Sequence, residues 1–281
     1  MKKIGTFLFS FIPYLLSIGI QYIALFYLML VSALFIFRIA PAITGRYTSE
    51  TDLNALWADQ NFNSIIMIAF SVSCIVIYGI WYYKSCGGNF RVNIKKTFHP
   101  LQIIGTIIMI PGTQFATSLL VGIISMIFPS WLAAYQELMN SVGMNEAEIP
   151  LFVMIYSVCI APIGEELIFR GVTMRIARRA FPFWFANLLQ AVLFGVFHGN
   201  MMQGCYAFAL GLVLGYICER GGHIYHAILF HFLFNLWGTT SSLWIERVNE
   251  SLLGYIILLS TFVVLPLGFS IFNRGIQKKN N

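Results

Sequence analysis

The sequence predicts an all-α fold, a polytopic bundle of transmembrane helices with about eight spans. Hydrophobic residues make up 58% of the 281-residue chain, only 10% of its residues are charged, and its mean hydropathy is +0.78. Soluble domains carry roughly 25% charged residues, so this composition excludes an ordinary soluble protein. The stretches between apolar segments are too short to build a soluble unit. We therefore expect residues 1–281 to form a single membrane-embedded domain.

The candidate spans follow from the apolar stretches, taken in order, because a helix needs about 20 apolar residues to cross a bilayer. The first stretch is far longer than the roughly 7–15 apolar residues of a signal peptide, so it is expected to remain as a helix. The fifth and sixth are short and meet near Gly199. The eight predicted spans are residues 10–36, 62–83, 101–128, 150–170, 183–199, 203–218, 224–243 and 251–272.

The loops between these spans alternate in charge. With eight spans, 14 of the 17 basic residues fall on one side and 8 of the 11 acidic residues fall on the other. Because cytoplasmic loops are enriched in Lys and Arg, both termini are predicted to be cytoplasmic. The net charge of +6 thus sets topology and does not indicate nucleic-acid binding. The short loops point to a multi-pass protein of a bacterial cell membrane.

Small residues and cysteines say less about function. Gly211 and Gly215 are four residues apart in the sixth span, a spacing that favours close helix packing, more often inside a protein than between copies. The five cysteines show no paired spacing. This argues against a disulfide framework or a cysteine metal cluster.

The fourth span contains three charged residues, Glu165, Glu166 and Arg170. Charges at mid-bilayer cost about 2.5–3.5 kcal/mol each on insertion scales, and they usually mark a function. Glu166 and Arg170 are spaced i,i+4 with the acid first, which favours an ion pair on one helix face. Glu165 points about 100° away and has no partner nearby in the sequence, which suits a general base or acid. Pro162, one turn earlier, is expected to kink the helix and admit water beside Glu165.

Three more polar residues lie deep in later spans. His198 is in the fifth, and His231 and Asn235 share one face of the seventh. With Glu165, they lie roughly 10–22 Å from the predicted cytoplasmic boundary. Polar groups at this depth have few partners except one another, so we expect the four to converge. The nearby basic cluster after Arg170 predicts that their site opens towards the cytoplasm.

The stretches EELIFR, FGVFH and HFLFN fit the patterns E-E-x-x-x-R, F-x-x-x-H and H-x-x-x-N, in that order on successive helices. This combination resembles the CPBP family, the CAAX-processing and bacteriocin-processing (Abi) intramembrane endopeptidases. The resemblance covers residues 150–240, the expected catalytic core. It implies a glutamate-dependent endopeptidase without a cofactor or metal. In this reading Glu165 and His198 activate water, His231 and Asn235 stabilise the oxyanion, and Glu166 and Arg170 complete the first motif.

The residue types support the same chemistry independently. Peptide hydrolysis needs a base for water, donors for the oxyanion and a proton for the leaving amine. The sequence contains no Gly-x-Ser-x-Gly and no intramembrane Asp, which argues against serine and aspartyl proteases. A zinc metalloprotease with Glu165, His198 and His231 as ligands remains an alternative, although His-Glu-x-x-His is missing.

The sequence is also compatible with functions that involve no catalysis. The chain could be a bacteriocin-immunity or partner-binding membrane protein, or a transporter whose buried carboxylates relay protons. No inverted repeat of the kind many transporters show is evident. The favoured prediction is hydrolysis of a membrane-associated peptide or protein near the cytoplasmic face, with the lipid bilayer as surroundings and no nucleic acid as partner.

Overall fold

The computed structural model describes residues 2–46, 48–86, 97–144, 149–241, 245 and 247–280. Every regular element in these ranges is helical, which confirms the predicted all-α class. Several charged residues used in the topology prediction lie outside the described residues: Arg91, Lys95, Lys96, Glu146, Glu148 and Glu246.

The described helices follow the predicted spans closely. Six of them are long and apolar enough to cross a membrane. The other two predicted spans, Phe183–Phe197 and Ile224–Thr240, are shorter, with 15 and 17 helical residues. The α-helices are α1 (Lys2–Phe9), α2 (Ile12–Leu34), α3 (Ala40–Thr44), α4 (Glu50–Ala58), α5 (Gln60–Ser85), α7 (Pro100–Ile127), α8 (Pro129–Ser141), α9 (Leu151–Met154), α10 (Ala161–Glu166), α11 (Arg175–Ala177), α12 (Phe183–Phe197), α13 (Met201–Gly221), α14 (Ile224–Thr240), α16 (Glu250–Leu259) and α17 (Leu265–Asn280). The π-helical turns are η1 (Phe35–Ile39), η2 (Ile155–Ile160), η3 (Leu167–Met174) and η4 (Ser260–Val264).

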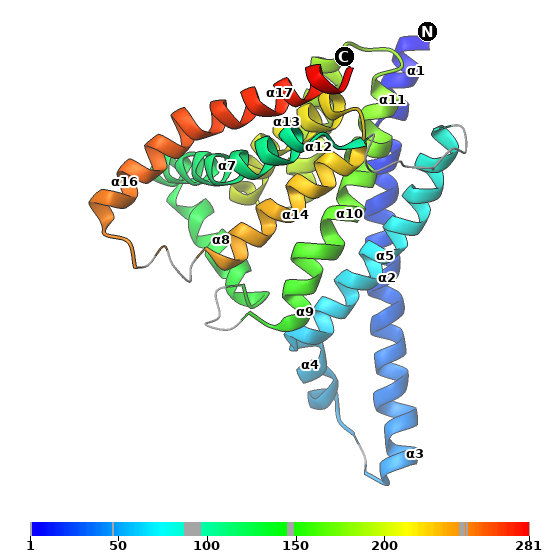
Figure 1. Cartoon of the computed structure of the whole chain (residues 1–281). Helices are drawn as coiled ribbons and strands as arrows, with labels where there is room; N and C mark the ends of the chain where they lie inside the picture. Colours follow the sequence, from blue (N-terminus) through cyan, green and yellow to red (C-terminus); the bar gives the residue numbers. More distant parts are fainter. Residues whose placement is uncertain are drawn as a thin grey trace.

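The chain ends lie together at one end of the molecule, and α3 and α4 lie at the opposite end (Figure 1). Helices α2 and α5 and the α9–α11 rod run between these ends on one side of the molecule, and α7 packs beside α17 on the other side. Contacts at the terminal end join the helices: Arg178 pairs with Glu219 at 2.9 Å, and Lys279 donates to the Thr97 carbonyl. We call the end of the molecule that holds both termini the terminal end, and the end with α3 and α4 the distal end.

Close helix crossings depend on glycine. A Cβ on Gly211 would lie 3.1 Å from Ala191 of α12, and one on Gly215 would lie 1.8 Å from Asn187 Oδ1. The predicted packing through these two glycines is therefore within the protein. A close approach at glycine also joins α7 to α17, where a Cβ on Gly105 would lie 2.5 Å from the Phe272 nitrogen. That contact was not predicted, because its glycines are far apart in the sequence.

Three π-helical turns each end just before a proline. In η2, the Ala161 N–H reaches back five residues to the Tyr156 carbonyl, and Pro162 follows. The turns before Pro41 and Pro266 have the same register. Proline has no N–H and its ring crowds the preceding turn, so the helix widens there. The predicted disturbance at Pro162 is thus a local widening of the fourth span.

Candidate active site

The first motif provides a buried ion pair. Arg170 Nη1 lies 2.9 Å from Glu166 Oε1, and neither side chain is exposed. This is the predicted i,i+4 contact. The guanidinium also donates to the Gly211 carbonyl of α13 at 3.3 Å, and it lies 4.4 Å from the centre of the Phe194 ring. The pair is therefore held by two further helices.

His231 lies between the two glutamates. Its Nδ1 is 2.8 Å from Glu166 Oε1, and its Nε2 is 3.7 Å from Glu165 Oε2. A carboxylate accepts hydrogen bonds, so Nδ1 carries the proton shared with Glu166 when Glu166 is ionised. The sequence predicts that His231 and Asn235 share one helix face, and it offers no local partner for the Glu165 carboxylate. The imidazole from α14 is the neighbour that local spacing could not reveal.

His198 lies where α12 turns into α13. Gly199 adopts a left-handed conformation with φ of 66°, and Asn200 caps α13 by accepting from the Gln203 N–H. The His198 Nδ1 lies 2.8 Å from the Phe194 carbonyl. A carbonyl only accepts, so Nδ1 is the protonated nitrogen and Nε2 of the neutral ring has a free lone pair. The described hydrogen bonds and ion pairs include no contact between His198 and Glu165.

Asn235 is positioned by the widened turn. Its Nδ2 donates to the Ser157 carbonyl at 2.8 Å. In the π register of η2, that carbonyl would need the nitrogen of Pro162, which carries no hydrogen. The carbonyl is therefore available, and Asn235 satisfies it. One N–H and the carbonyl oxygen of the Asn235 amide remain for other partners.

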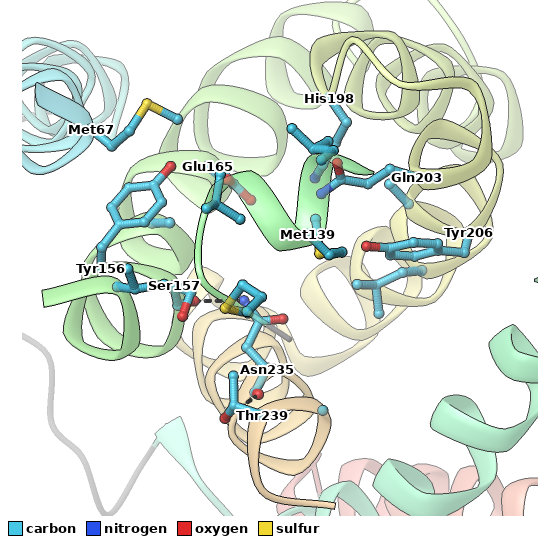
Figure 2. Close-up of a pocket in the computed structure, with 18 of the residues that line it drawn as sticks. Met67, Met139, Tyr156, Ser157, Glu165, His198, Gln203, Tyr206, Asn235 and Thr239 are labelled. Atoms are coloured by element: carbon cyan, nitrogen blue, oxygen red, sulfur yellow. Dashed lines mark hydrogen bonds between the residues drawn. The ribbon is translucent and has the colours of Figure 1, made fainter. Parts of the chain in front are cut away.

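A cavity of about 630 Å³ brings four of the six predicted residues together: Glu165, His198, His231 and Asn235 all line it. Figure 2 shows Glu165, His198 and Asn235 on its walls, with Tyr156, Gln203 and Tyr206 around them. Glu166 and Arg170 do not line it and lie behind His231. The prediction that the polar groups converge is confirmed for these positions.

Several lining residues were not predicted from the sequence. Gln114, Thr117 and Ser118 of α7 line the cavity, and the Gln114 Oε1 atom is buried without a hydrogen-bond partner. Their spacing of three and four residues puts them on one helix face within an apolar span. Three polar side chains on one face of an apolar span are a signal in the sequence that this face lines a cavity.

The cavity does not reach the terminal end, where the site was expected to open. It extends to Gln60 and Asn63 at the start of α5 and to Leu138 and Val142 near the end of α8, which lie at the distal end. Two of the arginines after Arg170 are engaged elsewhere: Arg175 donates to the Ser85 carbonyl and Arg178 pairs with Glu219. This cavity therefore does not lead to the predicted opening beside the basic cluster.

The zinc alternative depends on whether its three ligands meet. Within the part of the chain that the structure describes, no group of three or more His, Cys, Asp or Glu side chains is arranged to hold a metal ion. Glu165 and His231 are close, but the described hydrogen bonds and ion pairs include none that joins His198 to either of them. The ligand trio of this alternative is thus not among the assembled groups.

Comparison with known proteins agrees with the motifs. Residues 147–237 match the family described as "Type II CAAX prenyl endopeptidase Rce1-like". This segment therefore resembles the Rce1-like endopeptidases. The Rce1-like segment contains all three motifs, which confirms the resemblance to the CPBP family.

One curated protein is also similar to part of this chain. The protein named "Putative membrane peptidase YdiL" from Bacillus subtilis (strain 168) is 29% identical over 87 residues, which make up 31% of this chain and 35% of that protein. The chain thus covers about a third of this relative's length. No solved structure matches the chain. With its apolar helices, these findings identify an integral, multi-pass membrane protein.

Proposed function

We propose that this protein is an intramembrane endopeptidase in which Glu165 is the general base for hydrolysis of a membrane-associated peptide or protein. One observation carries the proposal. Glu165, His198, and the pair His231 and Asn235 come from three separate helices and line one cavity. The match of the Rce1-like segment to a peptidase family supports the same reaction class.

Glu165 and His198 have different roles towards the attacking water molecule. The Glu165 side chain is 14% exposed and faces the cavity, so it is accessible to a water molecule. Its carboxylate takes one proton from that water as the oxygen attacks the peptide carbonyl carbon. The free Nε2 lone pair of His198 accepts the hydrogen bond from the second water hydrogen, which orients the nucleophile.

The oxyanion needs donors on the other side of the carbonyl. Asn235 offers its second amide N–H while the first holds the Ser157 carbonyl. His231 gives Nδ1–H to Glu166, so it offers Nε2–H only as an imidazolium. Glu165 and Glu166 lie on either side of that ring, and Arg170 lies behind Glu166. Donors preorganised in this way stabilise the tetrahedral intermediate.

The hydrolysis needs no reactant other than the peptide and water. Glu165 passes the proton taken from water to the leaving nitrogen as the carbon–nitrogen bond breaks. One peptide bond and one water become a carboxyl group and an amine, and Glu165 returns to its starting state. Glu166 and Arg170 position His231 and take no part in bond making.

The test uses the full-length protein purified in detergent and reconstituted into vesicles. A pool of apolar peptides is incubated with the wild type and with Glu165→Gln, and new termini are identified by mass spectrometry. We expect cleavage by the wild type and none by the variant at equal folded content. Peptide binding without any cleavage by the wild type would reject the proteolytic function in favour of a partner-binding or immunity role.

A further inference from the structure

The walls of the cavity all come from one half of the bundle. Among the described helices, α5, α10 with its preceding turns, and α13 begin nearer the distal end and line the cavity with their first halves. Helices α7, α12 and α14 run the other way and contribute their second halves, for example through Thr117, His198 and Thr239. The cavity, whose lining runs from Glu165 to Gln60 and Val142, therefore leads to the distal end. That end lies away from both termini (Figure 1).

Charge sorts the two ends in the described part of the chain. Lys84, Arg179, Arg220 and Lys278 belong to the terminal end, as do the residues of the Arg178–Glu219 pair. The distal loops and helix ends contain more acids than bases: Glu50, Asp52, Asp59, Glu137 and Glu250 against Arg38, Arg46 and Arg247. Basic residues mark the cytoplasmic side of a membrane protein, so the distal end faces outward.

The cavity wall is almost free of charge. Among the described lining residues, Glu165 is the one carboxylate, and none is Lys, Arg or Asp. The remaining surface combines apolar side chains such as Met67, Met139 and Phe197 with amides such as Gln114 and Gln203. The buried, unpartnered Gln114 Oε1 is an acceptor for a peptide N–H. Such a wall suits an extended, uncharged peptide, because away from Glu165 and His231 a charged side chain would lose its hydration without gaining a partner.

We infer that the site receives its substrate from the outer face of the membrane, as an uncharged, extended segment of a membrane-anchored peptide or protein. That this segment is a substrate rests on the proposed function, but the entry face and the charge preference follow from the cavity and the loops. Outward entry replaces the cytoplasmic access expected from the basic cluster.

Thiol labelling tests the entry face without any need for activity. Cys86, Cys159, Cys205 and Cys218 are changed to Ser and the buried Cys74 is kept. Single cysteines are then placed at exposed Ser141, at exposed Arg179 and in the cavity wall at Thr239. Intact bacterial cells are treated with a maleimide that cannot cross the membrane, and then again after permeabilisation.

We expect Ser141→Cys and Thr239→Cys to be labelled in intact cells and Arg179→Cys to be labelled only after permeabilisation. Labelling of Arg179→Cys from outside would overturn the orientation. If Ser141→Cys reacts from outside while Thr239→Cys reacts only after permeabilisation, or not at all, the outward entry route is wrong.

Peptide binding tests the substrate class. The probes are photoreactive ten-residue peptides of Leu, Ala, Ser and Gln, with Lys or Asp placed singly along the peptide. Crosslinking to Glu165→Gln measures binding without turnover. We expect the neutral peptide to bind about tenfold or more tightly than peptides with a central charge. Equal binding of neutral and charged peptides would overturn the substrate class. If crosslinking and labelling behave as expected but the wild type cleaves nothing, the proposed proteolysis fails while the entry face and preference stand.

Discussion

Nδ1 of His231 lies 2.8 Å from Oε1 of Glu166, the carboxylate oxygen that also lies 2.9 Å from Arg170 Nη1. One oxygen thus links a helix-internal ion pair to an imidazole from another helix. The contact orients the opposite ring nitrogen towards Glu165, 3.7 Å away. The two adjacent glutamates therefore have different surroundings and are expected to respond differently to substitution.

Glu165→Gln is expected to abolish peptide cleavage with little change in stability, because this side chain borders the cavity and has no ion pair within its own helix. Glu166→Gln is expected to reduce the folding free energy by about 3–5 kcal/mol, because Arg170 would remain buried without its counter-charge. Unfolding in mixed detergent micelles and cleavage assays separate the two effects. In the double variant Glu166→Gln/Arg170→Met most of the lost stability should return. Equal loss of stability in both single variants would contradict this division.

Pro162→Ala tests how Asn235 is positioned. The alanine restores an N–H that can bond to the Ser157 carbonyl, so the Asn235 amide loses its anchor. Turnover is expected to fall strongly with little loss of stability. Pro266→Ala is the matched control, since Pro266 follows the same kind of widened turn and lies outside the cavity lining. An equal fall in turnover for both variants would mean that the Pro162 effect is not specific to Asn235.

Gly215→Ala is expected to destabilise the crossing of α12 and α13. Its Cβ would lie 1.8 Å from Asn187 Oδ1, which accepts from Gln190 at 2.7 Å. Overpacking of this kind costs about 1–3 kcal/mol. Gln190 also donates to the Gly211 carbonyl that holds Arg170, so activity should fall with stability. The control Gly19→Ala has nothing within 4 Å of its Cβ, and it should leave both properties unchanged. Unchanged melting of Gly215→Ala would show that α13 can shift freely.

Metal dependence separates the glutamate mechanism from the zinc alternative. Under the proposed mechanism, activity survives strong chelators, and Asn235→Ala lowers turnover by about 10²–10³, the usual effect of losing an oxyanion donor. Elemental analysis of active protein should then find no stoichiometric metal. One zinc per chain that is lost in His198→Ala, with activity removed by chelation and restored by zinc, would reject Glu165 as a metal-free base.

The sequence by itself determined the helical class, the order of the apolar segments, the Glu166–Arg170 contact and four of the polar residues around the cavity. These features depend on local properties: hydropathy along the chain, the i,i+4 geometry of one helix, and the cost of leaving polar groups alone in lipid. The tertiary structure decided that His231 lies between the glutamates, that Asn235 holds the Ser157 carbonyl, and that the cavity leads to the distal end. Each of these depends on how separate helices cross and rotate against one another. Those crossings are set by glycine contacts such as Gly215 with Asn187 and Gly105 with Phe272, between residues that are distant in the sequence.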